Sequence, residues 1–153
     1  MKIEDHIKSS SDISIEKKAL LNIMYTQNII NDKFNEVLKP FELSGEQFNV
    51  LRILRGQKEK PCNMFLIQER MFAKTSNTTR LVDKLLIKEL VTRNICPDNR
   101  RKMEIMITQK GMDILENLDP KIKAHEQLFA NNLSAPELNQ LNILLEKYRG
   151  VSI

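Results

Sequence analysis

The chain has 153 residues, 41% of them hydrophobic and 29% charged, with only four glycines and five prolines. This length and balance are typical of one compact, helix-rich domain and argue against a disordered chain. The polar stretch 1–14 has no continuous apolar run, so it predicts neither a secretory signal nor a membrane anchor. We expect a cytoplasmic protein without a membrane partner.

The formal net charge of +4 is placed unevenly along the chain. Residues 60–110 carry eleven basic and five acidic side chains, residues 1–59 carry nine of each, and residues 111–153 have a net charge of −2. Lysine and arginine displace condensed counterions from duplex DNA, so this distribution indicates a phosphate-binding segment in the middle of the chain. A merely solvated basic surface is the alternative.

Two helices are predicted before the basic segment. Apolar residues recur at steps of three, four or seven over residues 15–38 and predict a long first helix, which Pro40 ends. Ser44, with Gln47 three positions later, is typical of a capping box and predicts a short second helix that stops at Gly56.

Two more short helices follow within the basic segment. Asn63 can cap a third helix that ends near Met71, and Thr75 or one of its neighbours can cap a fourth. The expected buried side of the fourth helix carries Leu81, Val82, Leu85 and Leu86, and its other face carries Asn77, Thr78, Arg80 and Lys84. Such a pair is typical of a helix-turn-helix, whose second helix enters the major groove, although an ordinary helical hairpin has the same pattern.

A β-hairpin is predicted directly after the fourth helix. Residues 90–96 and 104–108 have strand patterns, and residues 97–102 form a basic tip between them. A helical hairpin has no reason to be followed by a cationic hairpin, so this arrangement favours a winged helix-turn-helix.

The C-terminal part predicts two further helices. The first begins near Gly111 and meets Pro120, which is expected to kink or interrupt it. Ser134 and Glu137 form a second capping box that opens the last helix. One small winged lobe cannot cover the whole apolar face of these helices, so we expect them to pack against a second copy of the chain.

The predicted fold is therefore mainly α with a small β-hairpin wing. We interpret residues 1–153 as a single domain, in which a winged helix-turn-helix DNA-binding lobe is flanked by N- and C-terminal dimerisation helices. The expected parts are an N-terminal dimerisation helix at 15–43, the lobe at 44–110 and C-terminal dimerisation helices at 111–150.

The segment 81–111 carries a family resemblance. Its Asp98-Asn99-Arg100 sequence is similar to the Asp-x-Arg wing of the MarR (multiple antibiotic resistance regulator) family, and Thr108 with Gly111 is similar to the Thr-x-x-Gly that opens the following helix. The order of the predicted helices is also similar to that of the family, over nearly the whole chain. The resemblance implies a transcriptional regulator, most commonly a repressor, that binds a pseudo-palindromic operator in double-stranded DNA as a homodimer and is released by a small-molecule ligand.

The resemblance also implies which residues bind DNA. In this family the helix before the wing lies in the major groove, and the wing arginine, here Arg100, lies in the minor groove. Arg101 and Lys102 are then expected to contact phosphates, and Asp98 and Arg93 to brace the wing. The expected recognition-helix residues are Thr75, Ser76, Asn77, Thr78, Thr79, Arg80 and Lys84.

One position departs from the family pattern. Glu89 stands where the family usually has glycine, between the recognition helix and the next strand. That site needs a left-handed backbone, which costs a non-glycine residue about 1 kcal/mol. A shifted helix end, and with it a shifted wing, is one possible consequence.

The effector expected from the resemblance is a small lipophilic or phenolic molecule bound where the first, second and fifth helices meet. The candidate lining residues are Met24, Asn28, Phe48, Arg52 and Met112. Each of them is also compatible with an ordinary core or surface position.

Other functions have weaker support in the sequence. Cys62 and Cys96 fit no CxxC spacing, although oxidation of Cys96 among basic residues would make a thiol-redox-responsive regulator. His6 and His125 lack neighbouring ligands at metal-binding spacing, no catalytic motif occurs, and no metal, cofactor or enzyme activity is expected. A winged helix that binds only proteins is the remaining alternative, but it predicts an acidic or apolar recognition face.

Overall fold

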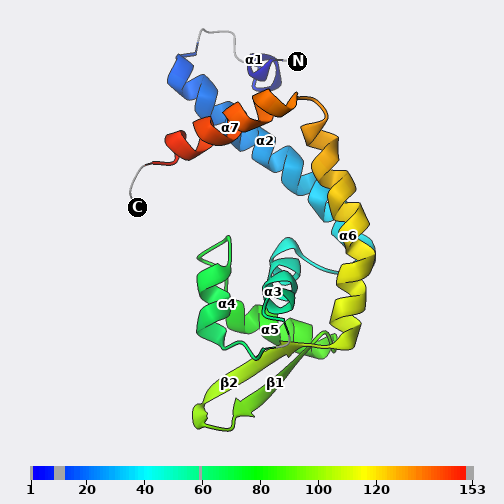
Figure 1. Ribbon diagram of the computed structural model, residues 1–153. Coiled ribbons are helices and arrows are strands. Elements are labelled where there is room, and N and C mark those ends of the chain that lie inside the picture. The colour runs from blue at the N-terminus through cyan, green and yellow to red at the C-terminus, as the bar shows by residue number, and fades with distance from the viewer. Residues whose placement is uncertain (1, 9–12, 59, 151–153) are drawn as a thin grey trace. The chain divides into compact units, whose positions relative to one another are not determined.

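The computed structural model describes residues 2–8, 13–58 and 60–150, so part of the polar stretch 1–14 lies outside the described residues. It forms two compact units, which divide between Gly45 and Glu46. In chain order the elements are α1 (Ile3–His6), α2 (Ile15–Leu38), the 3-10 helix η1 (Lys39–Phe41), α3 (Gly45–Gly56), α4 (Met64–Arg70), α5 (Thr78–Ile87), β1 (Val91–Cys96), β2 (Asn99–Ile107), α6 (Gln109–Ala130) and α7 (Ala135–Tyr148) (Figure 1).

The first unit is built around the long helix α2. Ser14 caps it by accepting a hydrogen bond from the Lys17 amide at 3.3 Å, and Pro40 lies in η1 directly after its last residue. The predicted first helix is therefore confirmed. The sequence patterns did not predict α1, which joins α2 through a 2.9 Å hydrogen bond between His6 Nδ1 and the Tyr25 hydroxyl.

The second unit has one apolar core, to which α3, α4, α5, the hairpin and α6 all contribute. Its fully buried side chains include Leu51, Ile67, Leu85, Leu90, Ile105, Leu115 and Leu118. The predicted start of α4 and the predicted end of α3 are both confirmed. Asn63 Oδ1 accepts the Leu66 amide at 2.8 Å, and α3 stops at Gly56.

The hairpin is antiparallel, and the part next to the lobe is paired in regular register from Val91–Ile107 to Ile95–Met103. Cys62 adds an isolated bridge to Ile105 through backbone N···O distances of 3.0 and 2.7 Å. The prediction that the second strand begins at residue 104 is wrong, because β2 begins at Asn99. Pairing of Cys96 with Asn99 extends the hairpin, despite the weak strand preference of the basic residues there.

The last two helices carry the caps that their sequences predict. Thr108 Oγ1 accepts the Gly111 amide at 3.1 Å to open α6, and Ser134 with Glu137 forms the capping box of α7. Helix α6 runs through Pro120 without interruption. In the described part of the chain, no helix is both long and apolar enough to cross a membrane.

Candidate nucleic-acid interface

The N-terminal turn of α5 presents polar side chains to solvent. Asn77 is the N-cap, and its Oδ1 accepts the Arg80 amide at 3.1 Å. Thr79, Arg80 and Lys84 are exposed, while Leu81 and its apolar neighbours on the opposite side are buried. The helix thus holds an arginine, a lysine and a threonine on one accessible surface, which can meet base edges and phosphates.

The loop before α5 is tied to the rest of the lobe by side-chain hydrogen bonds. The Ser76 hydroxyl donates to Glu46 Oε1 at 3.1 Å, and Gln68 Nε2 donates to the Lys74 carbonyl at 2.7 Å. Gln68 also accepts the hydroxyl of Thr78. These bonds hold the start of α5 in place, and the loop's own polar residues contribute to them.

Two details of the predicted recognition face are corrected. Thr78 is only 4% exposed, because its side chain turns inward to Gln68, so the expected exposed position at Thr78 is wrong. Thr75 lies in the preceding turn, and the cap is Asn77. Thr75, Asn77, Thr79, Arg80 and Lys84 are exposed, and Ser76 is half-buried.

The end of α5 has the left-handed residue that its sequence position requires. Glu89 has φ 60°, its amide bonds to the Leu86 carbonyl at 2.9 Å, and the Leu90 amide bonds to the Leu85 carbonyl at 3.0 Å. This is a Schellman motif, a common helix C-cap in which glycine usually occupies the left-handed position. The expected left-handed position is confirmed, and glutamate keeps the helix end in the ordinary geometry.

Arg93 braces the wing against α5. Its Nη1 lies 2.7 Å from Asp83 Oδ1, so an ion pair joins β1 to α5. Asp98 is exposed at the hairpin tip and makes no ion pair with any residue that the structure describes. The observed ion pair of the wing with α5 is thus between Arg93 and Asp83, and the only sequence signal for Asp83 is an acid on an otherwise basic helix face.

The basic residues of the wing project from an irregular part of β2. Cys96 pairs with Asn99 and Ile95 pairs with Met103, so Arg100, Arg101 and Lys102 lie between the two pairs without a partner on β1. All three are exposed. The bulge concentrates three positive charges at the end of the hairpin.

One compact junction connects α5, the hairpin and α6. The Thr108 hydroxyl donates to the Glu89 carbonyl at 2.8 Å while it caps α6, and Lys110 Nζ donates to the Lys88 carbonyl at 3.0 Å. A β-carbon at Gly111 would lie 2.5 Å from the Leu90 carbonyl oxygen, so only glycine fits there. This contact gives a physical reason for the Thr-x-x-Gly sequence.

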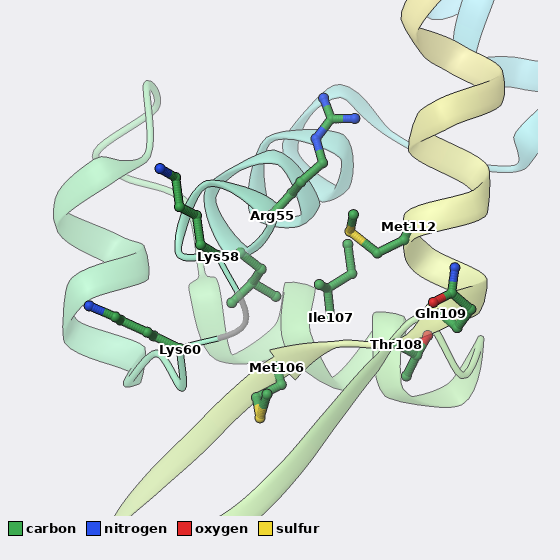
Figure 2. Close-up of a pocket in the computed structure, with 9 residues that line it drawn as sticks. Arg55, Lys58, Lys60, Met106, Ile107, Thr108, Gln109 and Met112 are labelled. Atoms are coloured by element: carbon green, nitrogen blue, oxygen red, sulfur yellow. The ribbon is translucent and has the colours of Figure 1, made fainter.

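A cavity of about 460 Å³ opens beside this junction (Figure 2). Its lining residues are Leu54, Arg55, Lys58, Lys60, Met106, Ile107, Thr108, Gln109 and Met112. Ile107 and Met112 point toward each other, whereas the amino groups of Lys58 and Lys60 extend away from them (Figure 2). Arg55 forms a bidentate ion pair with Asp119 at 2.9 and 3.0 Å.

Of the five residues expected to line an effector pocket, only Met112 lines this cavity. Phe48 is a core residue at 8% exposure. Arg52 lies over the Phe72 ring, 5.1 Å from its centroid, and bonds to Asn49. Met24 and Asn28 are exposed residues of α2 in the first unit.

The two cysteines differ in accessibility. Cys62 is fully buried, and this burial raises the pKa of its thiol, which makes it a poor nucleophile. Cys96 is half-buried at the end of β1. Among the described residues, no group of three or more His, Cys, Asp or Glu side chains is placed to hold a metal ion.

Comparison with known proteins finds similarity over the winged lobe. The MarR family model matches residues 43–103. YpoP of Bacillus subtilis (strain 168), an uncharacterized HTH-type transcriptional regulator, is 31% identical over 115 residues, which are 75% of this chain and 78% of that protein.

Solved structures extend the similarity to nearly the whole chain. A MarR transcription factor from Planctomyces limnophilus is 30% identical with a TM-score of 0.69, covering 89% of this chain and 98% of that one. A mutant MarR from E. coli, crystallised with operator DNA, is 25% identical with a TM-score of 0.77, covering 91% and 99% of the two chains. The chain therefore belongs to the MarR family of transcriptional regulators.

Proposed function

We propose that this regulator binds duplex DNA as a homodimer, with the start of α5 in the major groove and the wing in the adjacent minor groove. One observation carries the proposal. The exposed Arg80 side lies on α5 and the cationic bulge at Arg100 lies on β2. The Arg93–Asp83 ion pair joins α5 to β1, the strand that pairs with β2. A related MarR structure contains operator DNA, which supports the same role here.

The proposed contacts have two different tasks. Arg80 and the free amide group of Asn77 read base edges, whereas Thr79 and Lys84 bind phosphates and orient the helix. Arg100 enters the minor groove, and its neighbours in the bulge neutralise phosphates on the groove rims. Thr78 acts from inside the lobe by holding the start of α5.

The exposed apolar side chains of the terminal helices support dimerisation. In the second unit, Leu128, Leu141, Ile143, Leu144 and Tyr148 are 42–55% exposed. Leu20, Met24 and Ile29 are 38–52% exposed in the first unit. Apolar surface of this extent is typically covered by a partner, here a second copy of the chain.

A twofold dimer predicts a pseudo-palindromic operator with half-site centres about one helical turn apart. Occupying such a site blocks polymerase, so we propose a repressor. Release requires an effector that favours one spacing of the two lobes over another.

We propose that the cavity beside the wing junction takes this effector, a small lipophilic or phenolic molecule. Leu54, Ile107 and Met112 supply an apolar surface within a volume typical of small-molecule sites. Two of the seven methionines, Met106 and Met112, line it. Titrating 2-naphthol into protein labelled with ¹³C at the methionine methyls is expected to shift those two signals and leave Met24 unchanged. Shifts at Met24 alone, or none, would contradict this assignment.

The DNA-binding proposal is tested on duplexes selected from random-sequence DNA by the wild-type protein. Affinity is measured by mobility shift over a salt series for the wild type, Arg80→Ala, Arg100→Ala and the control Lys123→Ala, an exposed residue of α6. Arg80→Ala is expected to lose about tenfold in affinity and to relax the selected sequence at one position per half-site. Lys123→Ala is expected to bind like the wild type. Failure to select any sequence, or equal binding by all four proteins, would refute the proposal.

A further inference from the structure

The wing has two chemically different faces, which its register defines. Residues paired directly across an antiparallel ladder project on the same side, so Val91–Ile107, Arg93–Ile105 and Ile95–Met103 share one face. Near the lobe this face is core, since Val91 is 3% and Ile105 0% exposed. The other face carries the pairs Thr92–Met106 and Asn94–Glu104, so toward the tip it is polar.

The apolar face continues beyond the core toward the hairpin tip. Ile95 is 59% and Met103 42% exposed, although they are the next pair on the side that buries Ile105. Arg93 lies on this same face and reaches Asp83 on α5. The register therefore places the Ile95–Met103 pair on the face of the wing from which Arg93 reaches α5. The hairpin itself extends away from the helices of the lobe (Figure 1).

The surroundings of this pair are strongly basic. Arg100, Arg101 and Lys102 immediately precede Met103 and project without strand partners. A surface with apolar side chains beside three cations complements a ligand with apolar walls between anionic rims. The minor groove of DNA has this chemistry, because deoxyribose edges form its walls and phosphates form its rims.

We propose that Ile95 and Met103 pack against the deoxyribose walls of the minor groove and make binding depend on groove width. This inference rests on the proposed DNA-binding function and adds an uncharged contact to the cationic ones. A narrow groove, typical of A-tracts, brings both walls against the pair, whereas a wider groove leaves the pair partly hydrated.

The test compares variants on the selected duplex over a salt series. Ile95→Thr and Met103→Thr remove apolar surface but keep strand-compatible side chains, and each is expected to weaken binding about tenfold. The slope of affinity against salt is expected to stay at the wild-type value for both, whereas Lys102→Ala, which removes a phosphate contact, lowers it by about 0.9. Ile95→Val, which keeps most of the apolar surface, is expected to bind within about twofold of the wild type.

Asn94→Thr on the opposite face is the matched control and is expected to bind like the wild type. Duplexes with an A-tract or a G·C run under the wing test the groove-width dependence. Wild-type protein is expected to prefer the A-tract duplex, and Ile95→Thr to lose part of that preference. If Ile95→Thr and Met103→Thr keep the wild-type affinity and the wild-type preference for the A-tract duplex, the inference is overturned and the proposed function stands. The proposed function itself fails only if the wild-type protein does not bind DNA.

Discussion

Replacing Glu89 with glycine is expected to stabilise this protein. Glu89 holds φ 60° as the left-handed residue of the α5 cap, a conformation that costs an L-residue about 1–2 kcal/mol and glycine nothing. The greater freedom of glycine in the unfolded chain offsets about 0.4–1 kcal/mol of this gain. The Lys110 ion pair is 3.5 Å long and its glutamate is 82% exposed, so its loss costs at most about 0.5 kcal/mol.

Taken together, these contributions give an expected net gain for Glu89→Gly of about 0.5 kcal/mol in the free energy of unfolding. Urea titrations at one fixed protein concentration measure it, because a dimer's stability depends on concentration. Glu89→Ala is the control, since it removes the ion pair but keeps the strained backbone, and it is expected to be no more stable than the wild type. If Glu89→Gly proves less stable than Glu89→Ala, the cost assigned to the left-handed cap is wrong.

Three further predictions follow from the junction, the brace and the thiols. Gly111→Ala is expected to lower the free energy of unfolding by about 1–3 kcal/mol in urea titrations, because its β-carbon would lie 2.5 Å from a backbone oxygen. A double-mutant cycle of Asp83→Asn and Arg93→Ala is expected to show coupled losses of DNA affinity, and additive losses would exclude the brace. Native protein is expected to react with a disulfide reagent at Cys96 but not at Cys62, whose raised pKa and burial suppress the thiolate.

Local signals predicted most of the fold. Side-chain caps at Asn63 and Ser134 act within three residues, so they could be read directly from the sequence. The start of β2 could not, because Arg100, Arg101 and Lys102 have no strand preference of their own. Their place in the strand follows from the pairing of Cys96 with Asn99 across the hairpin.

The recognition face was harder to predict than the helix that carries it. The predicted buried side is confirmed at Leu81, Val82 and Leu85, and Thr78 belongs to the same side because it lies three and four residues before Leu81 and Val82. Its hydrogen bond to Gln68 joins two helices, which no local pattern reports. Arg80 keeps its expected exposure.

The most direct test of the central claim is a hydroxyl-radical footprint of the wild-type protein on the selected duplex. We expect two protected regions, related by twofold symmetry and centred about one helical turn apart, each with minor-groove protection that Arg100→Ala removes. A single protected region, or protection that Arg100→Ala leaves unchanged, would contradict binding by a dimer through α5 and the wing.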